Sequence, residues 1–166
     1  MPEDQVREDK EKPRKEILVL EETFSLYQEM TRQVPKYHFT RTKNSLTAKS
    51  QLREGNSYSL FVTNLGYGIK TPRFLNYDSK KRLIRDVSSY VPILVVTQSE
   101  RLSDIEAAVL AGAKGFLKRE GIKGDEQVIF WNLFSKVVRE LVEGNGKSNT
   151  LDEYMARERR VESNKK

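Results

Sequence analysis

The chain of 166 residues contains no cysteine and a single histidine, His38. Without cysteine it can form neither a disulfide nor a thiolate metal site, and one histidine cannot build a histidine-based metal cluster. No apolar run approaches the roughly 20 residues that span a bilayer, and the charged N-terminus lacks the apolar segment of a secretory signal. We therefore expect a cytoplasmic protein with no membrane segment.

Charged residues make up 33% of the sequence and hydrophobic residues 37%, with a net charge of +6. These proportions suit one small folded domain with charged flanks. Residues 1–15 have almost no apolar side chains and are predicted to be a disordered tail. Residues 16–143 form the predicted domain. Residues 144–166 are expected to be a linker and a charged helix, opened by a capping box from Thr150 to Glu153.

Short apolar runs alternate with amphipathic stretches throughout the predicted domain. Continuous apolar runs of this length are typical of strands that are covered on both faces, as in parallel sheets. The predicted strands are 16–20, 37–40, 59–63, 92–97 and 114–118. The predicted helices begin near residues 23, 45, 78, 103 and 125. This alternation predicts an α/β fold, a five-stranded parallel sheet with helices on both faces.

Polar side chains follow the carboxyl ends of these strands, the edge where open α/β sheets place ligands. Glu21 and Glu22 follow the first strand, and Asn64 follows the third, ahead of a turn with two glycines. Thr97 ends the fourth strand. Lys118 and Arg119 end the fifth.

The order of these segments resembles the receiver domain of two-component response regulators over roughly residues 16–143. The segments that carry the resemblance are Ile17-Leu18-Val19-Leu20-Glu21-Glu22, Leu60-Phe61-Val62-Thr63-Asn64, Pro92-Ile93-Leu94-Val95-Val96-Thr97 and Ala111-Gly112-Ala113-Lys114-Gly115-Phe116-Leu117. The resemblance implies a flavodoxin-like receiver fold. It also implies that Glu21 and Glu22 match an acidic pair that holds a divalent ion, and that Asn64 matches the phosphoacceptor aspartate. Thr97 matches the switch hydroxyl, Phe116 the rotating aromatic, and Arg119, or Lys118 after a one-residue shift, the phosphate-contacting cation.

The departures from the family pattern predict a site without phosphoryl chemistry, a pseudo-receiver. An amide oxygen carries no charge and is a poor nucleophile, so Asn64 should not accept a phosphoryl group. Glu21 and Glu22 replace two aspartates and lack a third negative charge, so Mg²⁺ should bind weakly. We expect no catalytic residue, no cofactor and no bound metal.

Plainer interpretations of the same residues remain open. Asn64 can be a polar strand cap that bonds the following turn, and Thr97 can cap the fourth turn without any switching role. Phe116 fits ordinary packing. Arg119 or Lys118 can pair with Glu21 or Glu22 in place of a metal.

A basic cluster lies between the third and fourth predicted strands. Such clusters are most often a solvated face, although interleaved Phe74 and Tyr77 make this one a candidate for anion or nucleic-acid contact. Its members are Lys70, Arg73, Lys80, Lys81, Arg82 and Arg85.

We expect a non-enzymatic, phosphorylation-independent module of signalling or transcriptional regulation. The resemblance implies that it binds a protein partner, or forms a homodimer, through the 102–143 face, built from residues 102–112, 114–118 and 125–143. A nucleic-acid-associated regulator using residues 70–85 and the tail is the less favoured alternative. An enzyme with a flavodoxin-like fold ranks last, because no Gly-rich phosphate loop follows the first strand.

Overall fold

The computed structural model describes residues 14–21, 24–54, 57–64, 73–97, 102–119 and 125–164. The described residues form one parallel sheet of five strands: β1 (Glu16–Leu20), β2 (His38–Thr42), β3 (Tyr58–Thr63), β4 (Ile93–Thr97) and β5 (Gly115–Lys118). Their order in the sheet is β2-β1-β3-β4-β5, so β2 and β5 are the edges. The predicted fold class is confirmed.

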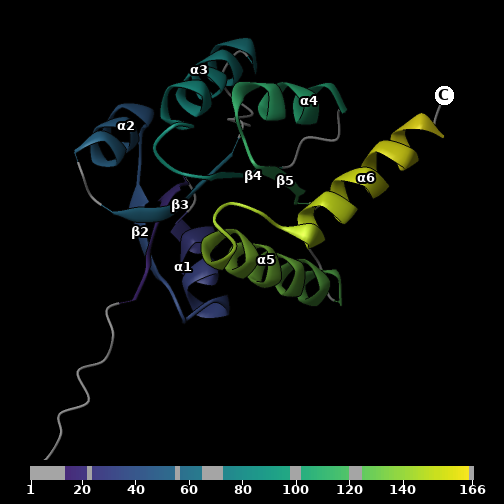
Figure 1. Ribbon diagram of the computed structural model, residues 1–166, viewed down its shortest axis with the longest axis horizontal. Helices are drawn as coiled ribbons and strands as arrows, with labels where there is room; N and C mark the ends of the chain where they lie inside the picture. Colours follow the sequence, from purple (N-terminus) through teal and green to yellow (C-terminus); the bar gives the residue numbers. More distant parts are fainter. Residues whose placement is uncertain are drawn as a thin grey trace, which may run out of the picture.

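Helices cover both faces of the sheet (Figure 1). They are α1 (Phe24–Gln33), α2 (Ser45–Arg53), α3 (Arg73–Val87), α4 (Leu102–Ala111), α5 (Asp125–Glu143) and α6 (Asn149–Ser163). In Figure 1, α1 and α5 lie on one face, α2, α3 and α4 lie on the other, and α6 runs beside β5. Among the described helices, none combines the length and the apolar character that a bilayer-spanning segment requires.

The core lies between the sheet and these helix layers. Phe61 of β3, Phe116 of β5 and Phe134 of α5 are each 0% exposed. The rings of Trp131 and Phe134 meet edge to face with their centroids 5.3 Å apart. Burying each large apolar side chain stabilises the fold by about 1.5–3 kcal/mol, which explains why the continuous apolar runs became the central strands.

Several element boundaries differ from their prediction. α3 begins at Arg73 rather than near residue 78, because the apolar spacing of Leu83, Ile84 and Val87 marks only its last turns. β2 runs from His38 to Thr42 rather than over 37–40.

Two predicted helix caps were also wrong. Asn44, not Ser45, caps α2, and its Oδ1 accepts a hydrogen bond from the Thr47 amide at 2.8 Å. Ser148, not Thr150, caps α6, and its Oγ accepts a hydrogen bond from the Leu151 amide at 3.0 Å. Neighbouring Ser, Thr and Asn residues can serve equally as caps, so sequence alone does not choose among them.

Helix α6 packs along the outer edge of β5 and contacts α4 and α5 as well. Its anchors are Leu151, 1% exposed, and Met155, 8% exposed. The hydroxyl of Tyr154 accepts a hydrogen bond from the backbone amide of Lys118 in β5 at 3.0 Å. The close approach requires a glycine at position 115, where a Cβ atom would lie 1.5 Å from Cδ2 of Leu151. The helix therefore covers a strand edge that would otherwise offer unpaired backbone groups.

The turn between α5 and α6 is held by the carboxylate of Glu140. It accepts hydrogen bonds from the Ser148 hydroxyl at 3.1 Å, the Thr150 amide at 3.1 Å and the Thr150 hydroxyl at 2.6 Å. Burial by itself would raise the pKa of Glu140, but these hydrogen bonds outweigh burial and hold the pKa below its ordinary value. The ionised carboxylate thus helps to fix where α6 starts.

Replacing Gly115 with Ala should lower the free energy of unfolding by about 1–3 kcal/mol, because the added methyl group overlaps Leu151 in a packed site. In a Leu151→Ala background the same change should cost much less, since the truncated side chain leaves room for the methyl group. Urea denaturation of the four proteins in this double-mutant cycle measures the coupling. Strictly additive costs would contradict the packing of α6 on β5.

The stability that Glu140 contributes should depend on pH. Because its folded-state pKa is lowered, the contribution is present above the ordinary value of 4.5 and is lost as the pH falls through the folded-state pKa. The difference in Tm between the wild type and Glu140→Gln should therefore shrink as the pH is lowered from 7 toward 3, a range of about four units chosen to cross that window. Glu153→Gln, at an exposed position of α6, is the control. A difference that does not change with pH would refute this role.

Candidate functional site

Of the polar residues predicted at the carboxyl edge, Glu21 and Asn64 meet there. β1 and β3 are neighbours, and their register pairs Leu20 with Thr63, so the residues that follow them lie side by side. Nδ2 of Asn64 donates a hydrogen bond to Oε2 of Glu21 at 3.4 Å. Glu21 is only 7% exposed, so its carboxylate faces the protein. Glu22 lies outside the described residues.

The backbone around this pair is fixed by neighbouring side chains. Nε of Arg41, in β2, donates to the carbonyl oxygen of Glu21 at 2.9 Å. The hydroxyl of Thr63 donates to the carbonyl oxygen of Asn64 at 3.2 Å. Arg41 was not predicted as part of this site, because nothing in its local pattern indicates a contact with a residue 20 positions away.

The ends of β4 and β5 form the other part of this edge. Thr97 is 3% exposed, and its carbonyl oxygen accepts a hydrogen bond from the Arg119 amide at 2.7 Å. Phe116 is fully buried. Within the described part of the chain no ion pair joins Arg119 to Glu21. Lys118 lines a groove between α5 and α6.

A divalent ion, which receiver folds commonly hold at this edge, does not fit the described residues. They supply a single carboxylate here, that of Glu21, and it already accepts an N–H from Asn64. The described residues contain no group of three or more carboxylate or histidine side chains that could hold a metal. Mg²⁺ prefers several anionic or carbonyl oxygens in octahedral geometry, whereas Asn64 here presents an N–H donor to the Glu21 carboxylate.

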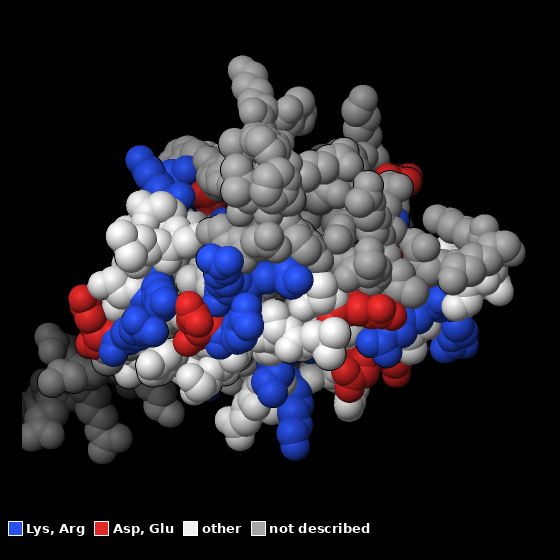
Figure 2. Space-filling view, turned by 90° about the horizontal axis from the view of Figure 1, so that it is seen from above, with Lys and Arg blue, Asp and Glu red and all other residues white. Residues whose placement is uncertain are grey.

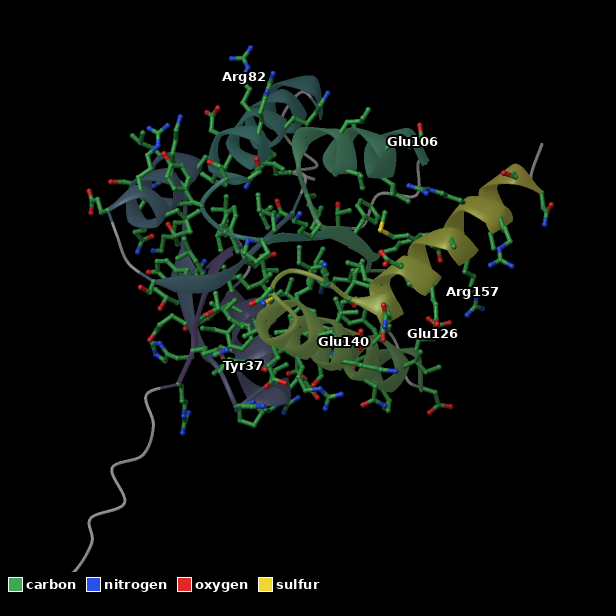
Figure 3. All side chains as sticks on the ribbon, viewed as in Figure 1. Tyr37, Arg82, Glu106, Glu126, Glu140 and Arg157 are labelled. Atoms are coloured by element: carbon green, nitrogen blue, oxygen red, sulfur yellow. The ribbon has the colours of Figure 1, made fainter. Side chains whose placement is uncertain are left out.

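The basic cluster does not form one continuous surface. Lys80 is 6% exposed and lies on the core side of α3 with Ile84 and Val87, which corrects the expectation that it belongs to a solvated face. Arg82 and Arg85 are exposed, and Arg82 points away from the sheet (Figure 3). Lys81 is half-buried. Lys70 and the side chain of Arg73 lie outside the described part.

Acidic residues interrupt the positive charge on this side of the molecule. Asp86 of α3 pairs with Lys49 of α2 at 2.8 Å. In the view of Figure 2, Lys and Arg side chains are interspersed with Asp and Glu. The described side chains therefore do not form a stripe of cations alone, which is the arrangement suited to a phosphate backbone.

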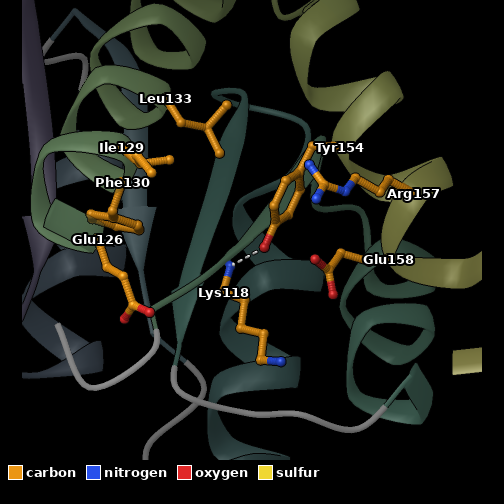
Figure 4. Close-up of a pocket in the computed structure, with 8 residues that line it drawn as sticks. All are labelled: Lys118, Glu126, Ile129, Phe130, Leu133, Tyr154, Arg157 and Glu158. Carbon is orange, nitrogen blue, oxygen red and sulfur yellow. Dashed lines mark hydrogen bonds between the residues drawn. The ribbon is translucent and has the colours of Figure 1, made fainter. Parts of the chain in front are cut away.

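The α5–α6 groove is the hollow between α5, α6 and the end of β5 (Figure 4). It has a volume of about 390 Å³ and is lined by Lys118, Glu126, Ile129, Phe130, Leu133, Tyr154, Arg157 and Glu158. This groove was not predicted from the sequence. The signal that could have found it is the apolar stripe of Leu151, Tyr154 and Met155, which requires a surface to pack on.

Comparison with known proteins identifies the fold. No protein-family model matches the chain, and no curated protein matches it in sequence. Similar solved structures include a response regulator from Thermotoga maritima, with a TM-score of 0.61 and 16% identity over 78% of this chain and 98% of that chain. A phosphorylated cyanobacterial phytochrome response regulator, RcpA, has a TM-score of 0.60 and 11% identity over 81% and 97% of the two chains.

A third similar structure is the signal receiver domain of an HD domain-containing protein from Pseudomonas fluorescens, with a TM-score of 0.56 and 15% identity. It covers 79% of this chain and 96% of that chain. At these identities the likeness is one of fold. The chain has the receiver fold of response regulators.

Replacing Asn64 with Asp should make stability depend on Mg²⁺. A second carboxylate beside Glu21 would repel the first, which we expect to lower the free energy of unfolding by about 1–2 kcal/mol in metal-free buffer. Millimolar Mg²⁺ should restore the loss, because a ligand of the folded state stabilises it by RT ln(1 + [L]/Kd). The wild type and Asn64→Ala should not respond. A rise in the Tm of the wild type with Mg²⁺, reversed by EDTA, would contradict the conclusion that a divalent ion does not fit this site.

Proposed function

We propose that this receiver-like chain acts without aspartyl phosphorylation and without enzymatic activity of its own. In this proposal it is a protein-interaction or dimerisation element in signalling or transcriptional regulation. The observation that carries the proposal is the hydrogen bond between Asn64 and Glu21, at the position where the receiver family has its acceptor aspartate and an acid of its ion-binding pair.

The chemistry of the amide supports this proposal. Phosphoryl transfer requires an anionic oxygen as the nucleophile, and the Asn64 amide has none. A carboxylate at that position also needs a cation beside it, because two neighbouring carboxylates repel one another. Asn64 instead supplies a donor N–H to Glu21, an interaction that involves neither phosphate nor metal. The site is suited to one permanent state rather than to a cycle of modification.

The surface of the chain supports a role in binding proteins. The expected interface is the 102–143 face, which includes β5. Helix α6 covers the outer edge of β5 within this face. Large apolar side chains remain exposed on either side, Leu110 of α4 at 87% and Ile129 of α5 at 68%. Ile129 lines the α5–α6 groove, so it offers a protein partner an exposed apolar side chain beside an apolar hollow.

The alternative of nucleic-acid association has less support. Burial of Lys80 and the pairing of Lys49 with Asp86 reduce the positive charge available on the α2–α3 side. Nucleic-acid affinity of the non-specific kind depends on many such charges acting together.

Incubation of the wild type with acetyl phosphate and Mg²⁺ should give no phosphoryl adduct at Asn64, because the amide lacks a nucleophilic oxygen. Intact-mass spectrometry measures the adduct. Asn64→Asp is the matched variant, since it restores the carboxylate and should label slowly wherever the neighbouring acids can hold Mg²⁺. An acid-labile phosphate on the wild type at residue 64 would overturn the proposal.

A separate measurement can contradict the proposed role in protein interaction. Submicromolar binding of duplex or single-stranded nucleic acid that survives at about 150 mM salt, where exposed charges are largely screened, would favour the nucleic-acid alternative.

A further inference from the structure

The α5–α6 groove has one wall from each helix. Glu126, Ile129, Phe130 and Leu133 follow one another at helical spacing along α5, and Tyr154, Arg157 and Glu158 do the same along α6 (Figure 4). Phe130 is buried and Leu133 half-buried, so the floor is apolar. Ile129 is 68% exposed at the rim. The wall of α6 continues past the groove to Val161, which lies seven residues beyond Tyr154 and is 43% exposed.

The charges at the rim balance. Two bases, Lys118 and Arg157, and two acids, Glu126 and Glu158, line the groove. Glu126 belongs to α5 and Arg157 to α6, so the two walls carry opposite charges at these positions (Figure 3). Within the described part of the chain, neither Glu126 nor Arg157 is engaged in an ion pair.

We propose that the α5–α6 groove binds the same groove of a second copy of this chain. A twofold interface joins the same patch on both subunits, so the patch must complement itself. This groove meets that condition, because it has an exposed apolar side chain, Ile129, beside an apolar hollow of about 390 Å³. It also has an acid on one wall and a base on the other. Under a twofold axis, Glu126 of each copy faces Arg157 of the other, while Ile129 enters the facing hollow.

The balance of charge favours a second copy over a partner of one sign. The rim has two bases and two acids. A strongly acidic or strongly basic partner would therefore be repelled by as many rim charges as attract it. Edge-to-edge pairing of β5 strands is blocked, because α6 lies along that edge and Tyr154 occupies the Lys118 amide. We assign self-association to the groove beside α6, because it combines an exposed apolar side chain with balanced rim charges. The inference rests on the proposed function, since it names the partner and the surface of that interaction module.

The apolar part of the proposal is tested by sedimentation velocity of the full chain over a wide concentration series. The wild type should pass from monomer to dimer, and Ile129→Asp should weaken dimerisation about tenfold or more, because it places a charge in the facing hollow. Val128→Asp is the matched control. Val128 is equally exposed, at 62%, and is the adjacent residue of the same helix, but it does not line the groove. It should dimerise as the wild type does.

The charge arrangement has a sharper test. Glu126→Arg and Arg157→Glu should each weaken dimerisation, because each homodimer then faces like charges across the axis. An equimolar mixture of the two variants should recover a heterodimer, because every facing pair in it is again one acid and one base. The double variant, with both changes in one chain, should dimerise like the wild type. Both positions are exposed, so folding is checked by circular dichroism and is expected to be unchanged.

A wild type that stays monomeric at every concentration, or a mixture in which no heterodimer forms, would contradict dimerisation through the groove. Neither result bears on Asn64, so the phosphorylation-independent role would stand or fall on the acetyl phosphate experiment. Conversely, a phosphorylated wild type that still dimerises through the groove would overturn that role and leave this interface in place.

Discussion

Covering a parallel sheet on both faces confines its polar chemistry to the ends of its strands. The central strands are buried along their length, as Val19, Val62 and Val95 show at 1% exposure or less. The polar groups that follow them can act only at the carboxyl edge, where β1 and β3 bring Glu21 and Asn64 together. A carboxylate held there needs a donor or a cation. In this chain the neutral amide of Asn64 supplies a donor to Glu21.

The parts that could be predicted from the sequence are those that local pattern controls. Apolar runs identified the strands, and because parallel neighbours end at one edge, Glu21 and Asn64 were expected to meet. Contacts between distant segments could not be predicted, such as Arg41 with Glu21 or Tyr154 with Lys118, because no periodicity links them. Lys80 was predicted to lie on a solvated face because its side chain is charged. Its spacing to Ile84 and Val87 marks the buried side of α3, where the aliphatic part of a lysine can pack.

The position of α6 shows how a single small residue can decide which surfaces a domain exposes. The existence of this helix was predictable, but its packing depends on a glycine in β5 that admits Leu151 and on a carboxylate in α5 that holds the turn. Together they place α6 over the outer edge of β5. The same placement of α6 forms the second wall of the α5–α6 groove. The packing of α6 on β5 therefore both covers the strand edge and forms the groove.

Closing the sheet with a helix also affects how the chain tolerates crowding and stress. An uncovered strand edge can pair with other strands and begin aggregation. Here the cover is held by few apolar anchors, Leu151 and Met155 among them, and such elements open locally at a lower free energy than global unfolding. The free energy of lifting α6 from β5, rather than that of global unfolding, would then set how often this strand edge is exposed.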